Sequence, residues 1–223
     1  MESLEQWLPF WPRLNEAQRK QLSAAARERL VPKGTLLHRG AEDCVGLMLV
    51  LEGQLRVYTL SEEGKELTLY RLLERDLCLF SASCLFHSIQ FDVLVSAERD
   101  TRVIHIPAEV YRSLMEESAA VAGYTNELMA SRFSDVMWLM DQILNKKLDA
   151  RLAAFLLEER ELTGSAELSV THEQIGTYLG SAREVVTRML RYFQAEGLVR
   201  LGRGSLLVLD EPRLEKLAAG SRR

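Results

Sequence analysis

The chain has 223 residues, of which 47% are hydrophobic and 27% charged, a composition typical of a folded protein long enough to form two hydrophobic cores. Its formal net charge of −4 excludes a protein that coats nucleic acid without regard to sequence, and the acidic Glu2 and Glu5 differ from the basic start of a signal peptide. The longest apolar run, residues 45–51, is far too short to cross a membrane, and three cysteines argue against a disulfide framework, so we expect a cytoplasmic protein with no membrane contact.

The first 110 residues predict a domain built mainly of short β-strands. After a short helix, expected over residues 15–29, the segment 33–106 divides into short strands rich in Val, Leu and Tyr and separated by glycines. Such strands are typical of a barrel or jelly roll, which can enclose one small ligand. Three of them, expected at residues 47–51, 54–60 and 66–73, predict a meander. This arrangement resembles the β-roll of cyclic-nucleotide-binding sensor domains.

The segment 75–87 matches the place where cyclic-nucleotide-binding relatives carry a Gly-Glu pair for the ribose and an arginine for the phosphate. This chain reads R-D-L-C-L-F-S-A-S-C-L-F-H there, with neither element. A buried phosphate without these partners would be poorly satisfied, so the sequence disfavours cyclic AMP. An iron-sulfur cluster is also disfavoured, because no cysteine precedes Cys44 and three thiolates are one fewer than a cluster normally takes. Haem bound through His87 is not expected, because the sequence shows no second haem ligand. The sequence therefore does not identify the effector.

Five residues are candidates for the effector pocket: Tyr70, Cys78, Ser81, Ser83 and Cys84. The two cysteines could form a reversible disulfide that moves this loop, or they could pack beneath it as small apolar side chains. We favour packing, which is what free cysteines usually do. The two serines could hydrogen-bond to a small effector or merely cap a one-turn helix.

A long helix is expected between the two halves, from about Tyr111 or Glu117 to Asn145, in a dimerisation segment of residues 111–145. Five apolar side chains in it follow the 4, 3, 4, 3 spacing of a heptad seam and predict a homodimer interface, namely Met129, Phe133, Val136, Met140 and Ile143. A second stripe, formed by Val121, Tyr124 and Leu128, is expected to pack on the β-roll. The alternative, in which both stripes belong to the chain's own core, stays open.

Residues 146–223 carry the most informative motif of the chain. After a helix over residues 148–160, the segment 171–193 predicts two short helices separated by Gly180. Thr171 is expected to cap the first helix, and Ser181 with Glu184 predicts a capping box for the second. The second helix has a buried stripe of Val186, Met189, Leu190 and Phe193, which leaves a polar face of Arg183, Glu184, Thr187, Arg188 and Arg191.

A hairpin is expected after these helices. Gly197 ends the second helix, and strands over residues 198–201 and 205–209 flank the turn Gly202-Arg203-Gly204. The order helix, turn, helix, hairpin is the winged helix-turn-helix of DNA-binding domains. Arg203, at the wing tip, could contact a phosphate or could simply be solvated.

The charge distribution agrees with this division. Residues 1–145 carry 15 basic and 21 acidic side chains, whereas residues 146–223 carry 13 and 11. Between residues 181 and 209 there are five arginines and two glutamates. A locally basic face on an acidic protein favours a directed contact with DNA, and binding that weakens as salt rises.

The segment from Leu148 to Asp210 resembles the DNA-binding half of the Crp/Fnr family of transcription regulators, and S-A-R-E-V-V-T-R is similar to that family's recognition-helix signature. The resemblance implies that Arg183, Glu184 and Arg188 contact base edges. Arginine can bind guanine bidentately, and glutamate can accept a hydrogen bond from cytosine. The resemblance also implies a homodimer on a palindromic duplex, with RNA polymerase as a further partner. The remaining candidate DNA contacts are Thr171, Ser181, Thr187, Arg191 and Arg203.

The fold class expected is therefore α+β, with an N-terminal β-roll, a dimerisation helix and a C-terminal winged helix-turn-helix. A ligand or redox change in the roll would shift the seam and reorient the recognition helices. The rival hypothesis is a sensor module whose winged helix contacts protein instead of DNA. An enzyme is not expected, because the four histidines are scattered and no metal-spaced cluster or catalytic triad is present.

Overall fold

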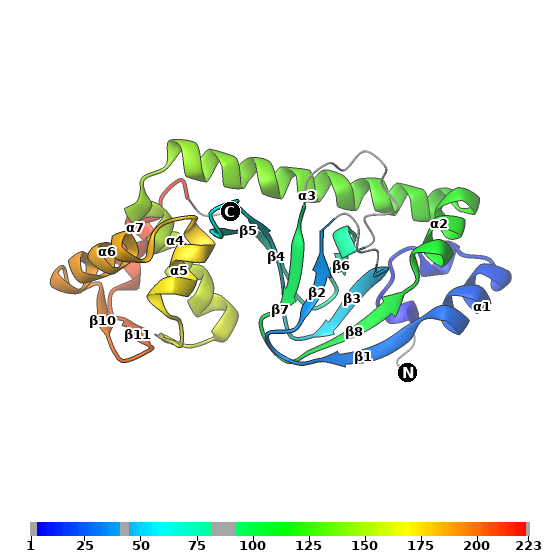
Figure 1. The fold of residues 1–223 in the computed structure, drawn as a ribbon, viewed down its shortest axis with the longest axis horizontal. Helices are drawn as coiled ribbons and strands as arrows, with labels where there is room; N and C mark the ends of the chain where they lie inside the picture. The colour runs from blue at the N-terminus through cyan, green and yellow to red at the C-terminus, as the bar shows by residue number, and fades with distance from the viewer. Residues whose placement is uncertain (1–3, 41–44, 82–91, 222–223) are drawn as a thin grey trace. The chain divides into compact units, whose positions relative to one another are not determined.

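The computed structural model describes residues 4–40, 45–81 and 92–221 (Figure 1). The chain forms two compact units. The first comprises Met1–Gly64 and Leu69–Val136, and the second comprises Lys65–Thr68 and Met137–Arg223. In the described residues, no helix combines the length and the apolar character needed to cross a membrane.

The first unit begins with helical segments. Two short 3-10 helices, η1 (Leu4–Gln6) and η2 (Trp11–Arg13), precede α1 (Glu16–Ala25). Asn15 and Gln18 form a capping box at the start of α1, each side chain accepting the other's backbone N–H at 2.9 and 3.0 Å. The helix ends earlier than residue 29, because Arg27 already pairs with His105 in a β-ladder.

Two four-stranded sheets make up the β-roll, as expected from the short glycine-separated strands. One has the order β1-β8-β3-β6 and the other β2-β7-β4-β5. The bounds are β1 Arg27–Val31, β2 Leu36–Arg39, β3 Leu47–Glu52, β4 Leu55–Leu60, β5 Glu66–Leu72, β6 Leu77–Cys78, β7 Leu94–Ala97 and β8 Thr101–Ile106.

The expected meander is only partly right, because β4 neighbours β5 but β3 lies in the other sheet. The chain crosses between the sheets at Gly53, whose φ is +97° and whose added Cβ would lie 2.6 Å from the Asp100 carbonyl oxygen. Only glycine suits that conformation and approach.

The residues of β3 alternate between two cores. Leu47, Leu49 and Leu51 pack with the helices on one side, and Met48 and Val50 face the interior of the roll. This is the two-residue period of a strand that is buried on both faces. Buried side chains from both sheets therefore form a core inside the roll.

Two helices follow the roll, α2 (Ala108–Glu117) and α3 (Ala119–Asn145). The sequence predicted one long helix starting at Tyr111 or Glu117, and α3 starts close to the later position because the backbone of Ser118 is extended. The expected inner stripe on α3 packs on the first unit's core, with Val121 buried and Tyr124 and Leu128 against it.

The second unit contains the winged helix. Its elements after α3 are α4 (Leu148–Thr163), β9 (Glu167–Leu168), α5 (His172–Leu179), α6 (Arg183–Ala195), β10 (Val199–Leu201), β11 (Leu206–Val208) and α7 (Glu211–Leu217). The strands form one antiparallel sheet in the order β10-β11-β9. The two helices and the hairpin agree with the sequence expectation, whereas β9 and α7 were not foreseen.

Candidate nucleic-acid interface

The turn between α5 and α6 is set by two glycines. The capping box at Thr171 forms as expected, with Gln174 N–H donating to the threonine Oγ1 at 3.2 Å. At the other end Gly180 has φ +59°, a left-handed conformation that ends the helix. Gly176 lies under the turn, where an added Cβ would approach the Ser181 carbonyl oxygen to 2.7 Å. The close approach of α5 to the start of α6 therefore requires glycine.

The expected capping box at Ser181 is wrong. The backbone N–H of Ser181 donates to the Gly176 carbonyl at 2.9 Å, so this residue still belongs to the end of α5. The chain turns into α6 one residue later, at Ala182, and no side chain caps the new helix. Glu184 therefore does not cap α6, which leaves contact with a base edge as the role expected of it.

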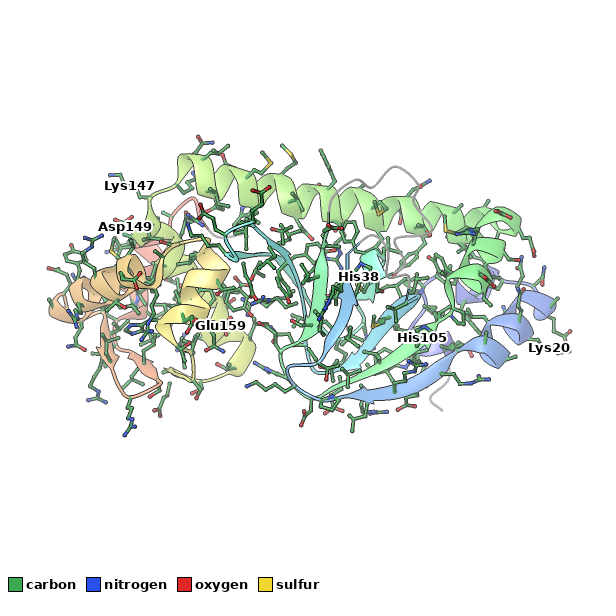
Figure 2. All side chains as sticks on the ribbon, in the orientation of Figure 1. Lys20, His38, His105, Lys147, Asp149 and Glu159 are labelled. Atoms are coloured by element: carbon green, nitrogen blue, oxygen red, sulfur yellow. The ribbon has the colours of Figure 1, made fainter. Side chains whose placement is uncertain are left out.

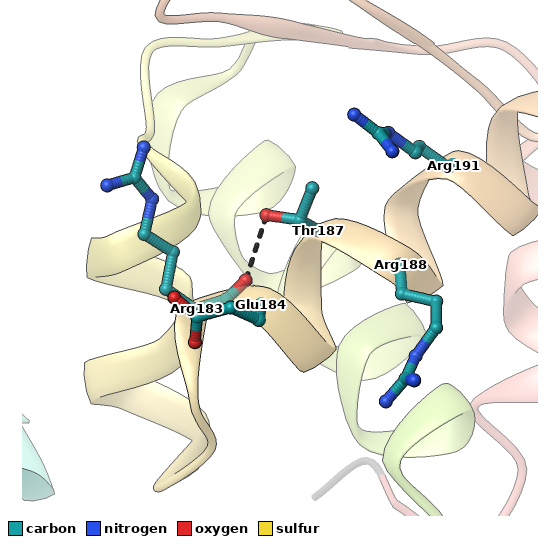
Figure 3. Close-up of a pocket in the computed structure, with 5 residues that line it drawn as sticks. All are labelled: Arg183, Glu184, Thr187, Arg188 and Arg191. Carbon is teal, nitrogen blue, oxygen red and sulfur yellow. Dashed lines mark hydrogen bonds between the residues drawn. The ribbon is translucent and has the colours of Figure 1, made fainter.

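The polar face of α6 forms an open depression of about 390 Å³, lined by Arg183, Glu184, Thr187, Arg188 and Arg191 (Figure 3). These are the five residues that the sequence placed on this face. On the opposite face Val186, Leu190 and Phe193 are fully buried. In the part of the chain that the structure describes, no ion pair joins Glu184 to Arg188, although they are one turn apart. Both are exposed side chains available to an external partner.

Thr187 is held in place by two hydrogen bonds. Its hydroxyl donates to the Arg183 carbonyl at 2.8 Å, and His172 Nδ1 lies 2.9 Å from the Thr187 hydroxyl oxygen. His172 was missed by the sequence reasoning, although its place directly after the Thr171 cap put it on the first turn of α5. Burial, with smaller contributions from Arg183 and Arg191, lowers the pKa of His172 below its ordinary value.

Arg203 lies exposed at the tip of the β10–β11 hairpin, as expected of a wing. The turn is closed by the Gly202 N–H, which donates to the Ser205 carbonyl at 2.8 Å, and Gly204 has φ +76°. The arginine side chain is therefore presented by a tight turn instead of packing on the domain.

Three of the candidate effector residues lie near one buried arginine in the first unit. The guanidinium of Arg132, on α3, lies 4.9 Å from the Tyr70 ring centre. Cys78 is buried beside Tyr70, and Ser81 donates its hydroxyl to the Cys78 carbonyl at 3.1 Å. Burial raises the pKa of the Cys78 thiol, which supports packing over redox chemistry. Ser83, Cys84 and His87 lie outside the described residues.

Sequence reasoning missed the charges around Arg132. This side chain forms ion pairs with Asp76 at 2.7 Å and Asp135 at 3.1 Å. Burial opposes its charge, but the two carboxylates outweigh that effect, and the pKa of Arg132 lies above its ordinary value. No sequence pattern marked Asp76 as its partner, because the two residues are 56 positions apart.

The three histidines in the described part of the chain, His38, His105 and His172, do not form a metal site. His38 and His105 lie on β2 and β8 of the first unit (Figure 2), and His172 lies in the second unit. The described residues contain no group of three or more metal-ligating side chains.

An exposed apolar stripe runs along the C-terminal half of α3. Phe133, Met137, Met140 and Leu144 are spaced 4, 3, 4 residues apart and are 67, 46, 47 and 72% exposed. Ile143, expected in the seam, is 39% exposed beside this stripe, and Val136 is half-buried. Met129 is a poor seam residue, because it packs against the core of the first unit. Three of the five expected seam residues, Phe133, Met140 and Ile143, are therefore exposed, together with Met137 and Leu144.

Comparisons with known proteins find similarity along most of the chain. Residues 28–118 match a cyclic nucleotide-binding domain, and residues 150–217 match a Crp-like helix-turn-helix domain. A crystal structure of a transcriptional regulator of the Crp/Fnr family from Eubacterium rectale ATCC 33656 is 57% identical, with a TM-score of 0.94, over 96% of this chain and 99% of its own. The cyclic AMP receptor protein of Thermus thermophilus is 27% identical, over 87% of this chain and 89% of its own. The transcriptional activator protein anr of Pseudomonas aeruginosa is 28% identical, over 87% and 81%.

Proposed function

Because the chain belongs to the Crp/Fnr family of DNA-binding transcription regulators, we propose that it acts as a homodimer whose α6 helices read a palindromic duplex site. One observation carries the proposal. The polar face of α6 presents Arg188 and Glu184 exposed and without an ion pair between them, so both are available to base edges.

The chemistry of these side chains suggests the sequence that they recognise. Arg188 can donate two hydrogen bonds to guanine O6 and N7, and Glu184 can accept one from cytosine N4. The two residues are one helical turn apart and line the same depression. We infer that each half-site contains a G·C pair contacted by both. Arg183, Thr187 and Arg191 extend the same face. Around it, we propose that Thr171, Ser181 and Arg203 contact the DNA backbone.

The stripe of Phe133, Met137, Met140 and Leu144 supports a second copy of the chain as the partner. A palindrome requires two recognition helices about 34 Å apart, related by a two-fold axis. An exposed heptad seam on the helix that precedes the DNA-binding domain can supply that axis. Because the protein is proposed to bind duplex DNA, we expect it to act in the cytoplasm. We expect RNA polymerase as a further partner and no catalytic activity.

The described residues around Arg132 do not fit a cyclic nucleotide. Asp76 and Asp135 already neutralise the guanidinium, so a cyclic phosphate would add an anion beside two carboxylates. Arg132 is therefore not suited to bind a cyclic phosphate, and we propose that the signal is a different small molecule or a redox change. Calorimetric titration with cyclic AMP is expected to give no binding heat, and micromolar affinity would contradict this part of the proposal.

Selection from random duplexes, followed by band-shift titration of the recovered site, tests DNA recognition. The wild-type protein is expected to prefer a palindrome with one G·C pair per half-site, and to bind more weakly as salt rises. Arg188→Ala should remove about 1 to 3 kcal/mol of discrimination at that pair.

Arg200→Ala is the matched control, because Arg200 is an exposed arginine on β10 outside the depression. It should bind the selected site and a scrambled duplex with the wild-type ratio. If Arg188→Ala also kept that ratio, the assignment of this residue would be wrong. Failure of the wild-type protein to select any sequence would favour a winged helix that contacts protein.

A further inference from the structure

Hydrogen bonds fix which ring nitrogen of His172 carries a proton. His172 Nδ1 lies 2.9 Å from Thr187 Oγ1. The Thr187 hydroxyl donates to the Arg183 carbonyl at 2.8 Å, the bond drawn as a dashed line in Figure 3. A hydroxyl has a single proton, and here the carbonyl receives it. His172 Nδ1 is therefore the donor toward Thr187, and in the neutral ring the lone pair lies on Nε2.

The charges that act on this ring are positive. Arg183 and Arg191 face it from α6, while Glu173 follows it on α5 and is exposed. Burial and then these two arginines disfavour protonation of the ring, so that without DNA it is neutral at pH 7. A third cation at this position would add to the positive charge of Arg183 and Arg191.

A DNA phosphate would reverse this balance. The lone pair of a neutral Nε2 is a poor match for phosphate oxygens, whereas a protonated Nε2 is a charge-assisted donor to them. The phosphate also supplies the negative charge that the cluster of His172, Arg183 and Arg191 lacks. Protonation and DNA binding therefore favour each other.

We propose that His172 is a DNA-backbone contact that binds as the imidazolium, so that each protomer takes up one proton from solvent at Nε2 when it binds DNA. His172 Nδ1 keeps its hydrogen bond to Thr187 throughout and holds the base-reading face of α6 in position. This inference rests on the proposed recognition of duplex DNA by α6.

The test uses the full-length protein and the duplex recovered by selection, with fluorescence anisotropy between pH 5.5 and 8.0. Wild-type affinity should rise as pH falls, by up to about tenfold per protomer for each pH unit, and level off below the pKa of His172 in the free protein. Calorimetry at pH 7 in two buffers of different ionisation enthalpy should detect net proton uptake.

Two variants separate the proton from the structural role. His172→Asn keeps an N–H donor near the position of Nδ1 and cannot take up a proton, so its affinity should lose most of the pH dependence. His172→Arg carries a permanent charge and should bind at pH 8.0 at least as tightly as the wild type, with a similarly flat profile.

The outcomes separate the two proposals. Equal pH slopes in the wild type and either variant would overturn the role of His172, even with sequence-selective binding intact. If His172→Asn does not fold, as judged by its thermal transition, the His172→Arg profile decides alone. Absence of selective binding by the wild type at every pH would instead remove the proposed DNA recognition.

Discussion

Arg132 on α3 and Asp76, just before β6, form a 2.7 Å ion pair between residues 56 positions apart in the chain. The ion pair stabilises the packing of α3 on the β-roll. Arg132 is 12% exposed and also contacts Asp135 and the face of Tyr70, so it neutralises two carboxylates and packs against an aromatic ring. This cluster joins the candidate sensing region to the helix that carries the exposed seam.

Replacing the arginine should destabilise the protein. Arg132→Met leaves the Asp76 and Asp135 carboxylates without their cation, at an expected cost of about 3 kcal/mol, the lower end for a buried pair because Asp76 is one-third exposed. Urea unfolding of the full chain measures it. Lys20→Met, which removes an exposed ion pair with Glu16, should change stability by less than about 1 kcal/mol. Similar effects of both variants would contradict the structural role of Arg132.

Glu184 offers a test of function without a change in fold. Because Ser181 does not complete a capping box and no ion pair to Arg188 forms in the described residues, Glu184→Gln should alter stability by less than about 0.5 kcal/mol. The Glu184→Gln protein should show a weaker preference for the cytosine of the selected site, since an amide can donate as well as accept a hydrogen bond. Thermal unfolding and duplex selection provide the two measurements. A large loss of stability would show that the residue supports the helix.

The apolar stripe predicts where dimerisation can be broken. Met140→Lys places a charge in the middle of the seam and should shift the protein toward monomer in analytical ultracentrifugation. Binding to the full palindrome should fall with it, because one half-site contact is lost. Glu127→Lys, an exposed position on the same helix outside the stripe, should leave the dimer intact. Dissociation by both variants, or by neither, would argue against this register.

The absence of a side chain at Gly176 allows α5 to approach the start of α6 closely. Gly176→Ala introduces a Cβ about 2.7 Å from the Ser181 carbonyl and should cost roughly 1 to 3 kcal/mol, with loss of DNA affinity as the turn opens. Thr177→Ala, the next residue of α5, adds no such contact and should leave both properties near wild type. Calorimetric unfolding and band-shift titration compare the two. Normal stability of the Gly176→Ala variant would show that the turn can relax.

Local periodicity predicted the helices and hairpin of the DNA-binding unit, because buried positions such as Val186, Leu190 and Phe193 follow the 3.6-residue repeat. Capping failed at Ser181, since a left-handed glycine before it draws its amide back to α5. The expected seam is exposed only in part, because heptad spacing fixes intervals and not the direction in which a helix faces. Met129 satisfies the interval but packs on the core.

Long-range pairing lay beyond the sequence. Nothing near Arg132 indicates that Asp76 lies against it, and nothing in β3 or β4 indicates that the chain changes sheet at Gly53. His172 and Thr187, 15 positions apart, meet only because the glycine turn folds α5 onto α6. The five candidate DNA contacts on α6 were accessible to sequence reasoning because they share one short helix.

The glycine turn has a consequence for how such a regulator can diversify. Gly176 and Gly180 allow α5 to approach the start of α6 closely, and the buried face of α6 is formed by Val186, Leu190 and Phe193. Glu184 and Arg188 take no part in either. Substitution there is free to change the preferred operator while the scaffold is preserved, so a gene duplicate could acquire new targets by a few mutations without first acquiring new stability.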